Sequence, residues 1–412
     1  MNKNNISLDV ISPIYIGGAS ENHFGIGMDV FWQNGVLYRV DLKDLAPFFD
    51  DRMTSMIATA RSGEEIQKSL LSKGLNFKQI AKEAWNCPYP PEQDEVKALI
   101  RDGFGKRLIP GSSIKGALRS HLFRGLANSD TTSLNGLKQT VKRADNDRRI
   151  KRPVSEFEKR LLEVHIEGNT RKKEYLQLLR FLQVSDFSFD TSEIHPVKIY
   201  NLSKDEGRWA GAWKDRKSRG YGSNNNNNWD FSPRGFVTHY EVIAKQQQSN
   251  GRIVFNEPPE GGGFRTSHET FKRKFGALLP DGKMMLNDLF AMVNQNTLDY
   301  IDQELAFFKK YVDDDFVADN QIVPFYERLK EQVAHLKNAC ILRVGGGSGF
   351  HSITGNWLYK DHIESVERPL RLFMGGRIKN LTKSRKLTFQ PTGDELPNFQ
   401  PMGFIKLSIQ ST

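Results

Sequence analysis

Alternating apolar and polar residues at the start of the chain predict β-structure. Most even positions of residues 6–16 are apolar, although Pro13 interrupts the run, as in an edge strand or a bulge. A glycine-bearing loop follows this strand. Two short strand patterns come next, at 28–32 and 36–40, and the Asn-Gly pair between them is typical of a hairpin.

The pattern then changes to helical spacing. Residues 42–100 are expected to be mainly helical. A short strand is expected to end at residues 108–109, followed by a Pro-Gly turn and a helix that runs to about Leu126. Because serine is a preferred residue at a helix start, Ser112 or Ser113 is the expected N-cap.

The second half of the chain repeats this mixture of patterns. Strands are predicted at 179–189, 235–245, 252–255 and 403–409, and amphipathic helices at 284–312 and 325–339. We expect the strands at 235–245 and 252–255 to form a hairpin. Residues 203–233 lose all periodicity and contain a run of asparagines, which predicts a mobile linker.

Strands followed by helices, twice over, predict an α+β fold with two related halves. A length of 412 residues favours two to three domains. The expected units are an N-terminal domain at 1–200, a flexible segment at 201–233 and a C-terminal domain at 234–412.

The chain is basic. Its 59 Lys and Arg outnumber 49 Asp and Glu, giving a net charge of +10, which favours polyanionic partners. Only Cys87 and Cys340 occur, which excludes a disulfide framework and a cysteine zinc site and suits a reducing compartment. Because no stretch of about 18 apolar residues occurs, we expect a cytoplasmic protein with no membrane partner.

The segment 110–119, Pro-Gly-Ser-Ser-Ile-Lys-Gly-Ala-Leu-Arg, is the first candidate site. The hydroxyls of Ser112 and Ser113, with free N–H groups at a helix start, can hold phosphate oxygens. Lys115 and Arg119 are four residues apart and share one helix face beside that position. The alternative is an ordinary capped helix with two solvated cations. The spacing of a nucleotide-binding P-loop is absent.

A glycine-rich segment at 342–351 is the second candidate site. Four glycines in five positions permit close backbone approach to a ligand, and successive N–H groups can form an anion-binding nest. The ring of Phe350 could stack on a base. The alternative is a flexible turn without function. The candidate residues are Arg343, Gly345, Gly346, Gly347, Ser348, Gly349, Phe350 and His351, together with Gly17 and Gly18 of the first loop.

A basic stretch follows the glycine-rich segment. Residues 368–386 contain seven Lys or Arg and no acidic residue. Such a run is usually a solvated face, but its closeness in sequence to the glycines favours a surface that follows phosphates. Arg377 and Lys379 are its candidate RNA contacts.

Candidates for catalysis are poor by comparison. The nine histidines form neither an HxxxH nor an HExxH pair, and no GxSxG elbow occurs. His23 lies in the first glycine-bearing loop, where a general base could lie, although a lone loop histidine is more often structural. No spacing pairs Asp29 with Asp186, and Asp186 is expected to cap a turn. We therefore expect no enzyme, no metal site and no cofactor.

Several of these segments resemble the RAMP superfamily of CRISPR proteins. Residues 108–119 match its signature Ile-Pro-Gly-Ser-Ser-Ile-Lys-Gly-Ala-Leu-Arg over the full length. The first strand with Gly17 and Gly18, the Val-Ser-Asp segment at 182–186 and the loop at 344–350 resemble three further motifs of that superfamily.

Within the superfamily, the resemblance is strongest to the fifth-subunit family of type III-A Csm effector complexes. It rests on residues 8–41 and on the closing segment 401–407, where Phe404 replaces a more usual Trp. The segments 42–100, 120–180 and 203–233 match no motif.

The resemblance implies two ferredoxin-like (RRM-type) domains with helical and disordered insertions. It also implies a non-catalytic subunit that holds the 3′ part of the CRISPR RNA (crRNA), caps the backbone filament and contacts the repeating backbone subunit, with target RNA as a further candidate partner. The alternative is a histidine-dependent endoribonuclease of the same superfamily that processes crRNA. Those enzymes usually carry the glycine-rich loop close to the C-terminus, whereas here it ends 63 residues before Thr412.

Overall fold

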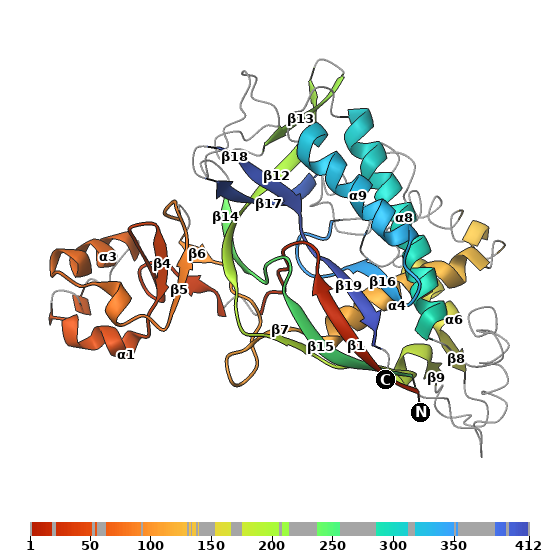
Figure 1. Ribbon diagram of the computed structural model, residues 1–412, viewed down its shortest axis with the longest axis horizontal. Coiled ribbons are helices and arrows are strands. Elements are labelled where there is room, and N and C mark those ends of the chain that lie inside the picture. Colours follow the sequence, from red (N-terminus) through yellow and green to blue (C-terminus); the bar gives the residue numbers. More distant parts are fainter. Residues whose placement is uncertain are drawn as a thin grey trace.

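The computed structural model shows two five-stranded sheets, helices packed on them and a smaller lobe at one side (Figure 1). It describes residues 2–18, 22–51, 54–55, 63–91, 94–129, 132, 134–136, 139, 153–165, 175–205, 208–213, 237–255, 286–311, 318–349, 352, 384–392 and 395–410. Within these residues, no helix has the length and apolar character needed to cross a membrane.

The first sheet is antiparallel throughout and joins the two ends of the described chain. Its strands are, in order, β10 (Leu182–Val184), β15 (Gln248–Phe255), β1 (Asn2–Val10), β19 (Phe404–Ile409) and β16 (Ala339–Arg343). Strand β1 is central, with Leu8 opposite Ser249 of β15 on one side and Leu407 of β19 on the other.

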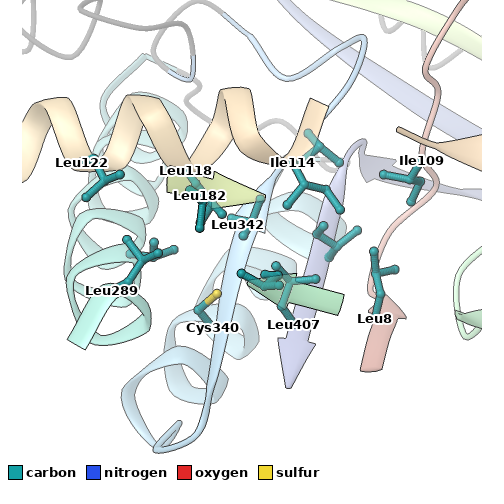
Figure 2. Packing of buried hydrophobic residues seen from close by; sticks show 14 of the residues in the cluster. Leu8, Ile109, Ile114, Leu118, Leu122, Leu182, Leu289, Cys340, Leu342 and Leu407 are labelled. Atoms are coloured by element: carbon teal, nitrogen blue, oxygen red, sulfur yellow. The ribbon is translucent and has the colours of Figure 1, made fainter. Parts of the chain in front are cut away.

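Helix α4 (Gly111–Ser129) and the first half of α8 (Leu286–Tyr311) cover one face of this sheet. Ile114, Leu118 and Leu122 recur every four residues, so they form one apolar stripe on α4 that faces the core. Figure 2 shows Leu118 beside Leu342 of β16, and both side chains are fully buried. Each such side chain stabilises the fold by about 1.5–3 kcal/mol.

Helix α8 also supplies hydrogen-bond partners for the backbone at the free edge of the first sheet. The side-chain amide of Asn294 donates to the carbonyl oxygen of Ala339 at 2.9 Å and accepts from the N–H of Ile341 at 3.1 Å. The hydroxyl of Thr297 donates to the carbonyl oxygen of Ile341 at 2.8 Å. Side chains therefore take the place of a further strand beside β16, which closes an edge that could otherwise pair with another chain.

The second sheet also has five strands. Its order is β13 (Arg208–Trp213), β12 (Glu193–Asp205), β17 (Ser384–Thr392) and β18 (Glu395–Pro401), and β14 (Thr238–Val242) pairs with β12 as well. The second half of α8 and helix α9 (Val323–Ala334) pack on it through Phe308, Tyr326, Phe389 and Phe399, all buried. Helix α8 thus takes part in both cores.

A buried ion pair fastens α8 to the second sheet. The carboxylate of Glu304 accepts from Nε and Nη2 of Arg385 at 2.7 and 2.8 Å, and the guanidinium lies 3.9 Å from the ring centre of Phe307. Two parallel hydrogen bonds of this kind give a fixed geometry as well as charge compensation. The pair therefore sets how α8 meets β17.

A lobe of its own is formed by β3 (Val30–Gln33), β4 (Val36–Arg39), β5 (Glu83–Asn86) and α3 (Gly63–Ser72). The remaining elements are β2 (Phe24–Gly25), α1 (Leu42–Leu45), β6 (Glu95–Val96), β7 (Arg107–Ile109), α6 (Pro153–Leu162), β8 (Glu163–His165), β9 (Tyr175–Gln177), β11 (Phe187–Phe189), and short turns of 3-10 or π helix at 46–48, 77–79, 178–181 and 318–322.

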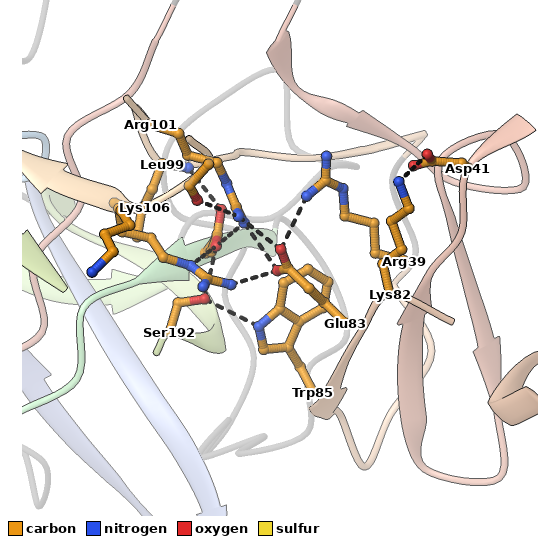
Figure 3. Close-up of polar contacts among 12 residues, drawn as sticks. Arg39, Asp41, Lys82, Glu83, Trp85, Leu99, Arg101, Lys106 and Ser192 are labelled. Atoms are coloured by element: carbon orange, nitrogen blue, oxygen red, sulfur yellow. Dashed lines mark hydrogen bonds and ion pairs between the residues drawn. The ribbon is translucent and has the colours of Figure 1, made fainter. Parts of the chain in front are cut away.

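Carboxylates and arginines join this lobe to the rest of the molecule (Figure 3). Glu83 of β5 accepts from Nη1 of Arg101 at 2.8 Å and from Arg39 at 3.0 Å. Nη2 of the same Arg101 donates at 2.5 Å to Glu241 of β14, which also accepts from Nε of Arg107 at 3.1 Å. Because Glu241 is fully buried, removing either arginine would leave a buried charge under-compensated.

Residues 42–100 contain the helices α1 and α3, as expected, and also the short strands β5 and β6. Two other expectations about local structure are wrong. Residues 203–213 are not without structure, since Tyr200 to Asp205 pair with β13. The strands predicted at 235–245 and 252–255 exist but do not form a hairpin. Strand β14 pairs with β12, whereas β15 pairs with β1 and β10.

Each five-stranded sheet combines strands from both sides of residues 201–233. The first sheet contains β1 and β10 from one side and β15, β16 and β19 from the other, and β12 pairs with β14 and β17 in the second sheet. The α+β class is confirmed, and the division into two ferredoxin-like domains stays a prediction.

Candidate nucleic-acid interface

The first candidate segment forms the start of helix α4. The helix begins at Gly111, so Ser112 and Ser113 lie in its first turn and neither is the N-cap, contrary to expectation. The cap comes from a distant residue, because Oδ1 of Asp186 accepts from the N–H of Gly111 at 2.7 Å. A Cβ atom at Gly111 would lie 2.1 Å from the carbonyl oxygen of Val184, so only glycine fits here.

A basic cavity lies along the exposed side of α4, and we call it the α4 cavity. Its volume is about 480 Å³. Ser112, Lys115 and Arg119 line it, which confirms that the two predicted cations share one helix face. Lys159 of α6 and Arg180 complete its basic wall, and Glu163 is its acidic residue. Four cations around one concave surface suit a phosphate backbone.

The cations of the α4 cavity differ in how they are held. Arg119 pairs with Glu158 of α6 at 2.9 Å, and burial raises the pKa of that glutamate despite the nearby guanidinium. Lys115 and Arg180 have no ion-pair partner in the part of the chain that the structure describes. These two side chains are therefore the ones available to a ligand, whereas Arg119 is oriented by Glu158.

The glycine-rich segment packs against the loop that follows β1. The N–H of Gly346 donates to the carbonyl oxygen of Tyr15 at 2.7 Å, and a Cβ atom at Gly345 would lie 2.3 Å from that same oxygen. A Cβ atom at Gly17 would in turn lie 2.3 Å from the hydroxyl of Tyr15. Tyr15 thus brings Gly17 and the second glycine segment together, while Gly18 lies beside Asn22.

Backbone conformation explains much of the glycine density. Gly345, Gly347 and Gly349 have φ angles of 78°, 86° and 79°, in the left-handed region that side chains rarely adopt. The atoms that a Cβ at Gly345 or Gly346 would meet first belong to Tyr15 of this same chain. Beyond Ser348, a Cβ atom at Gly349 would meet open space, so the far end of the loop is the part that can face a ligand.

Arg343 is not an outward-facing RNA contact, contrary to expectation. Its side chain is buried, Nε donates to the carbonyl oxygen of Met402 at 2.7 Å, and Nη2 donates to that of Gly347 at 2.9 Å. The third donor group, Nη1, is bonded to the hydroxyl of Tyr300. Arg343 is therefore a buried residue that bonds the backbone of the glycine loop from the interior side. Phe350, His351, Arg377 and Lys379 lie outside the described residues.

Two of the residues considered for catalysis, His23 and Asp29, lie at the junction of lobe and body, where they line a cavity of about 660 Å³. Nδ1 of His23 accepts from the N–H of Ala98 at 3.3 Å, and burial lowers the pKa of this imidazole. Asp29 accepts from the N–H of Gly25 at 2.8 Å, which fixes a tight turn. No cluster of three or more metal-binding side chains occurs among the described residues.

Sequence reasoning missed Lys159 and Arg180 as residues of the basic surface. Both belong to residues 138–180, where 13 Lys or Arg outnumber 7 Asp or Glu, but pattern alone could not place them beside α4. Only the packing of α6 and of the 3-10 turn at Leu178–Phe181 against α4 brings them there. The glycine loop does not line the α4 cavity, so the predicted residues form two separate groups.

Comparison with known proteins agrees with this architecture. One chain in the structure of the "Csm-crRNA-target RNA ternary complex in type III-A CRISPR-Cas system" is similar to this protein. The two superpose with a TM-score of 0.63 and 17% identity, over 99% of this chain and 100% of that one. Csm5 of T. onnurineus superposes with a TM-score of 0.60 and 15% identity, over 97% and 99% of the two chains. At such identities the likeness is one of fold. No curated protein matches in sequence.

The family is fixed by a match along most of the chain. The model of the RAMP superfamily matches residues 7–348, from β1 to the glycine loop. That range includes the start of α4, where a distant aspartate caps the signature helix, and the loop held by Arg343. The chain therefore belongs to the RAMP superfamily.

Proposed function

We propose that this chain is a non-catalytic, RNA-binding subunit of a type III CRISPR effector complex. Its role is to hold the 3′ part of the crRNA and to cap the backbone filament beside the repeating subunit, with target RNA as a further partner. The observation that carries the proposal is the α4 cavity, where the signature helix presents Lys115 next to Arg180. The fold of the chains in solved Csm structures supports the same class of complex.

The chemistry of the α4 cavity suits phosphate rather than a base. Lys115 is a half-buried point charge, and Arg180 is an exposed planar donor. The hydroxyl of Ser112 is exposed at the first turn of the helix, where it can donate to a phosphate oxygen. A hydroxyl and two cations placed for phosphate oxygens do not distinguish bases, so binding should depend on salt more than on sequence.

The glycine loop is the second proposed RNA contact. Gly347 and Gly349 have positive φ angles and Ser348 between them does not, and successive N–H groups on such an alternating backbone can form a nest for an anion. The guanidinium of Arg343 behind Gly347 fixes this shape before any ligand arrives. A pre-formed loop lowers the entropy lost on binding.

The rival function, a histidine-dependent endoribonuclease, would use His23. A general base needs a free ring nitrogen and is usually oriented by a third group. Here one ring nitrogen already accepts from the backbone of Ala98, and no carboxylate bonds the imidazole among the described residues. These contacts favour a structural role for His23.

The test is RNA binding by a variant in which the two available cations are reversed, Lys115→Glu with Arg180→Glu. A labelled CRISPR-repeat RNA is titrated at several salt concentrations. We expect affinity to fall at least tenfold at about 100 mM salt, and the slope of log K against log salt to fall by roughly two. The matched control, Lys337→Glu with Arg328→Glu, makes the same charge change on exposed residues in and just after α9. Equal loss in both variants would show that only net charge matters.

A further inference from the structure

A tight turn before β7 presents an aromatic ring to solvent. It runs from Arg101 to Arg107, which face each other across an isolated bridge. Oδ1 of Asp102 accepts from the N–H groups of Phe104 and Lys106, both at 2.9 Å. The N–H of Asp102 donates to the carbonyl oxygen of Lys106 at 2.9 Å. The backbone of this turn is therefore fixed from inside.

The ring of Phe104 is exposed to an unusual degree. The side chain is 96% exposed, whereas Leu42, the next most exposed large apolar residue among those described, is 56% exposed. Gly103 and Gly105 flank it, and a Cβ atom at either glycine would meet nothing within 4 Å. The tip thus projects clear of the body, next to β7 in Figure 1. A rigid turn that holds a phenyl ring in water gains nothing within this chain.

The charges beside the ring are already compensated. Arg101 and Arg107 bond Glu83 and Glu241, and Lys106 pairs with Asp190 at 3.1 Å. The carboxylate of Asp102 accepts from the turn itself. Surfaces that stack single-stranded RNA on aromatic rings combine those rings with cations that follow the phosphates. In the Phe104 turn both arginines are engaged by carboxylates and the remaining cation, Lys106, is paired with Asp190, so its charge pattern favours a protein partner over RNA.

We propose that Phe104 is an anchor that inserts into an apolar pocket on an adjacent protein subunit. The proposal rests on the proposed function, because it names a contact made when the chain joins an effector complex. Aromatic side chains that fill a pocket dominate the binding energy of protein interfaces. The fixed turn means that little entropy is lost when the ring is buried.

Photo-crosslinking tests which class of molecule the ring meets. The full chain, carrying a benzophenone analogue of phenylalanine at position 104, is co-expressed with the other subunits of a type III effector complex and with crRNA. After irradiation we expect an adduct with one protein subunit. An adduct with RNA, or no adduct in the assembled complex, would overturn the inference.

The amount of chain that enters the complex measures how much Phe104 contributes to assembly. We expect Phe104→Ala to reduce the amount of chain that co-purifies by at least about tenfold, and Phe104→Leu to reduce it less. The control Leu42→Ala removes an exposed apolar side chain of the lobe and should assemble as wild type does. The melting temperature of Phe104→Ala should stay within about 2 °C of wild type, since the ring touches little in the free chain.

The outcomes separate this inference from the proposed function. If the wild-type chain assembles and Phe104→Ala assembles equally well, the anchor is wrong and the RNA-binding role stands. If the wild-type chain does not join the complex at all, both proposals fail together. RNA affinity of the isolated Phe104→Ala chain should equal that of wild type, and a loss would place RNA at the ring.

Discussion

The carboxylate of Asp186 accepts a hydrogen bond from the N–H of Gly111, so the Val-Ser-Asp segment caps the signature helix of the superfamily. A carboxylate at this end complements the helix dipole. It also occupies the place that we expected a phosphate to take. We therefore expect phosphate to bind further along α4, near Lys115, which is where the α4 cavity opens.

Removal of this cap should weaken the fold. We expect Asp186→Ala to lower the free energy of unfolding by about 1–2 kcal/mol, because the N–H of Gly111 loses its acceptor and the helix dipole its counter-charge. Urea denaturation followed by circular dichroism measures the change. The control is Asp190→Ala, whose side chain is 82% exposed and should matter little. A variant as stable as wild type would mean that water replaces the cap.

The glycines of the loop should differ in their tolerance of a methyl group. We expect Gly345→Ala to be the most destabilising, because it combines a positive φ with a backbone oxygen 2.3 Å away. Gly347→Ala should rank second, since Sδ of Met402 at 3.0 Å can move aside. Gly349→Ala should cost about 1 kcal/mol, from the positive φ alone. Denaturation midpoints of the three variants give the order, and equal losses would show that packing plays no part.

The stability of the protein should fall in mild acid because of His239. Its imidazole is buried on β14, Nδ1 has no hydrogen-bond partner among the described residues, and burial lowers its pKa to about 4. The unfolded chain binds a proton here below pH about 6.5 and the folded chain only near pH 4, so unfolding takes up a proton between these values. Stability therefore decreases as the pH falls through this window.

The size of the effect at pH 5 is roughly 2 kcal/mol for this one group. We expect His239→Gln to lose less stability than wild type between pH 7.5 and pH 5, as measured by urea denaturation at each pH. The matched control is His335→Gln, on an exposed side chain. Parallel curves for His239→Gln and wild type would place the acid sensitivity elsewhere.

His23 should be dispensable for RNA cleavage. We expect His23→Ala to leave any RNA-related activity of an assembled complex within a fewfold of wild type, because its ring bonds the backbone of Ala98. Removing a general base would instead lower the rate by about a hundredfold or more. Rates with a repeat-containing RNA, compared under single-turnover conditions, distinguish the two, and the larger loss would favour the endoribonuclease.

Local patterns predicted the elements that depend on nearby residues. Helix α4 and strand β19 lie close to where apolar spacing and the Pro-Gly turn put them. The pairing of β14 and β15 could not be predicted, because their partners are β12 and β1, far away in sequence. A short loop between two strand patterns favours a hairpin only when no other strand offers a better partner.

The candidate site shows the same limit. Lys115 and Arg119 were placed correctly because four residues make one helical turn. Arg343 was misplaced because a cation beside glycines suggests a ligand, whereas burial against Tyr300 and Met402 depends on the whole fold. Asp186 was expected to cap a turn, and its true partner at Gly111 lies 75 positions away.

The central place of β1 in the first sheet has a consequence for biosynthesis. Its neighbour β19 ends at Ile409, so β1 is synthesised long before the strand with which it pairs. While the chain is still on the ribosome, β1 has an open edge, and the face that α4 covers lacks Leu407. Contacts so distant in sequence form slowly. A chain that stops before β19 would therefore leave β1 and β16 without the strand that joins them, and the sheet on which α4 rests would be incomplete.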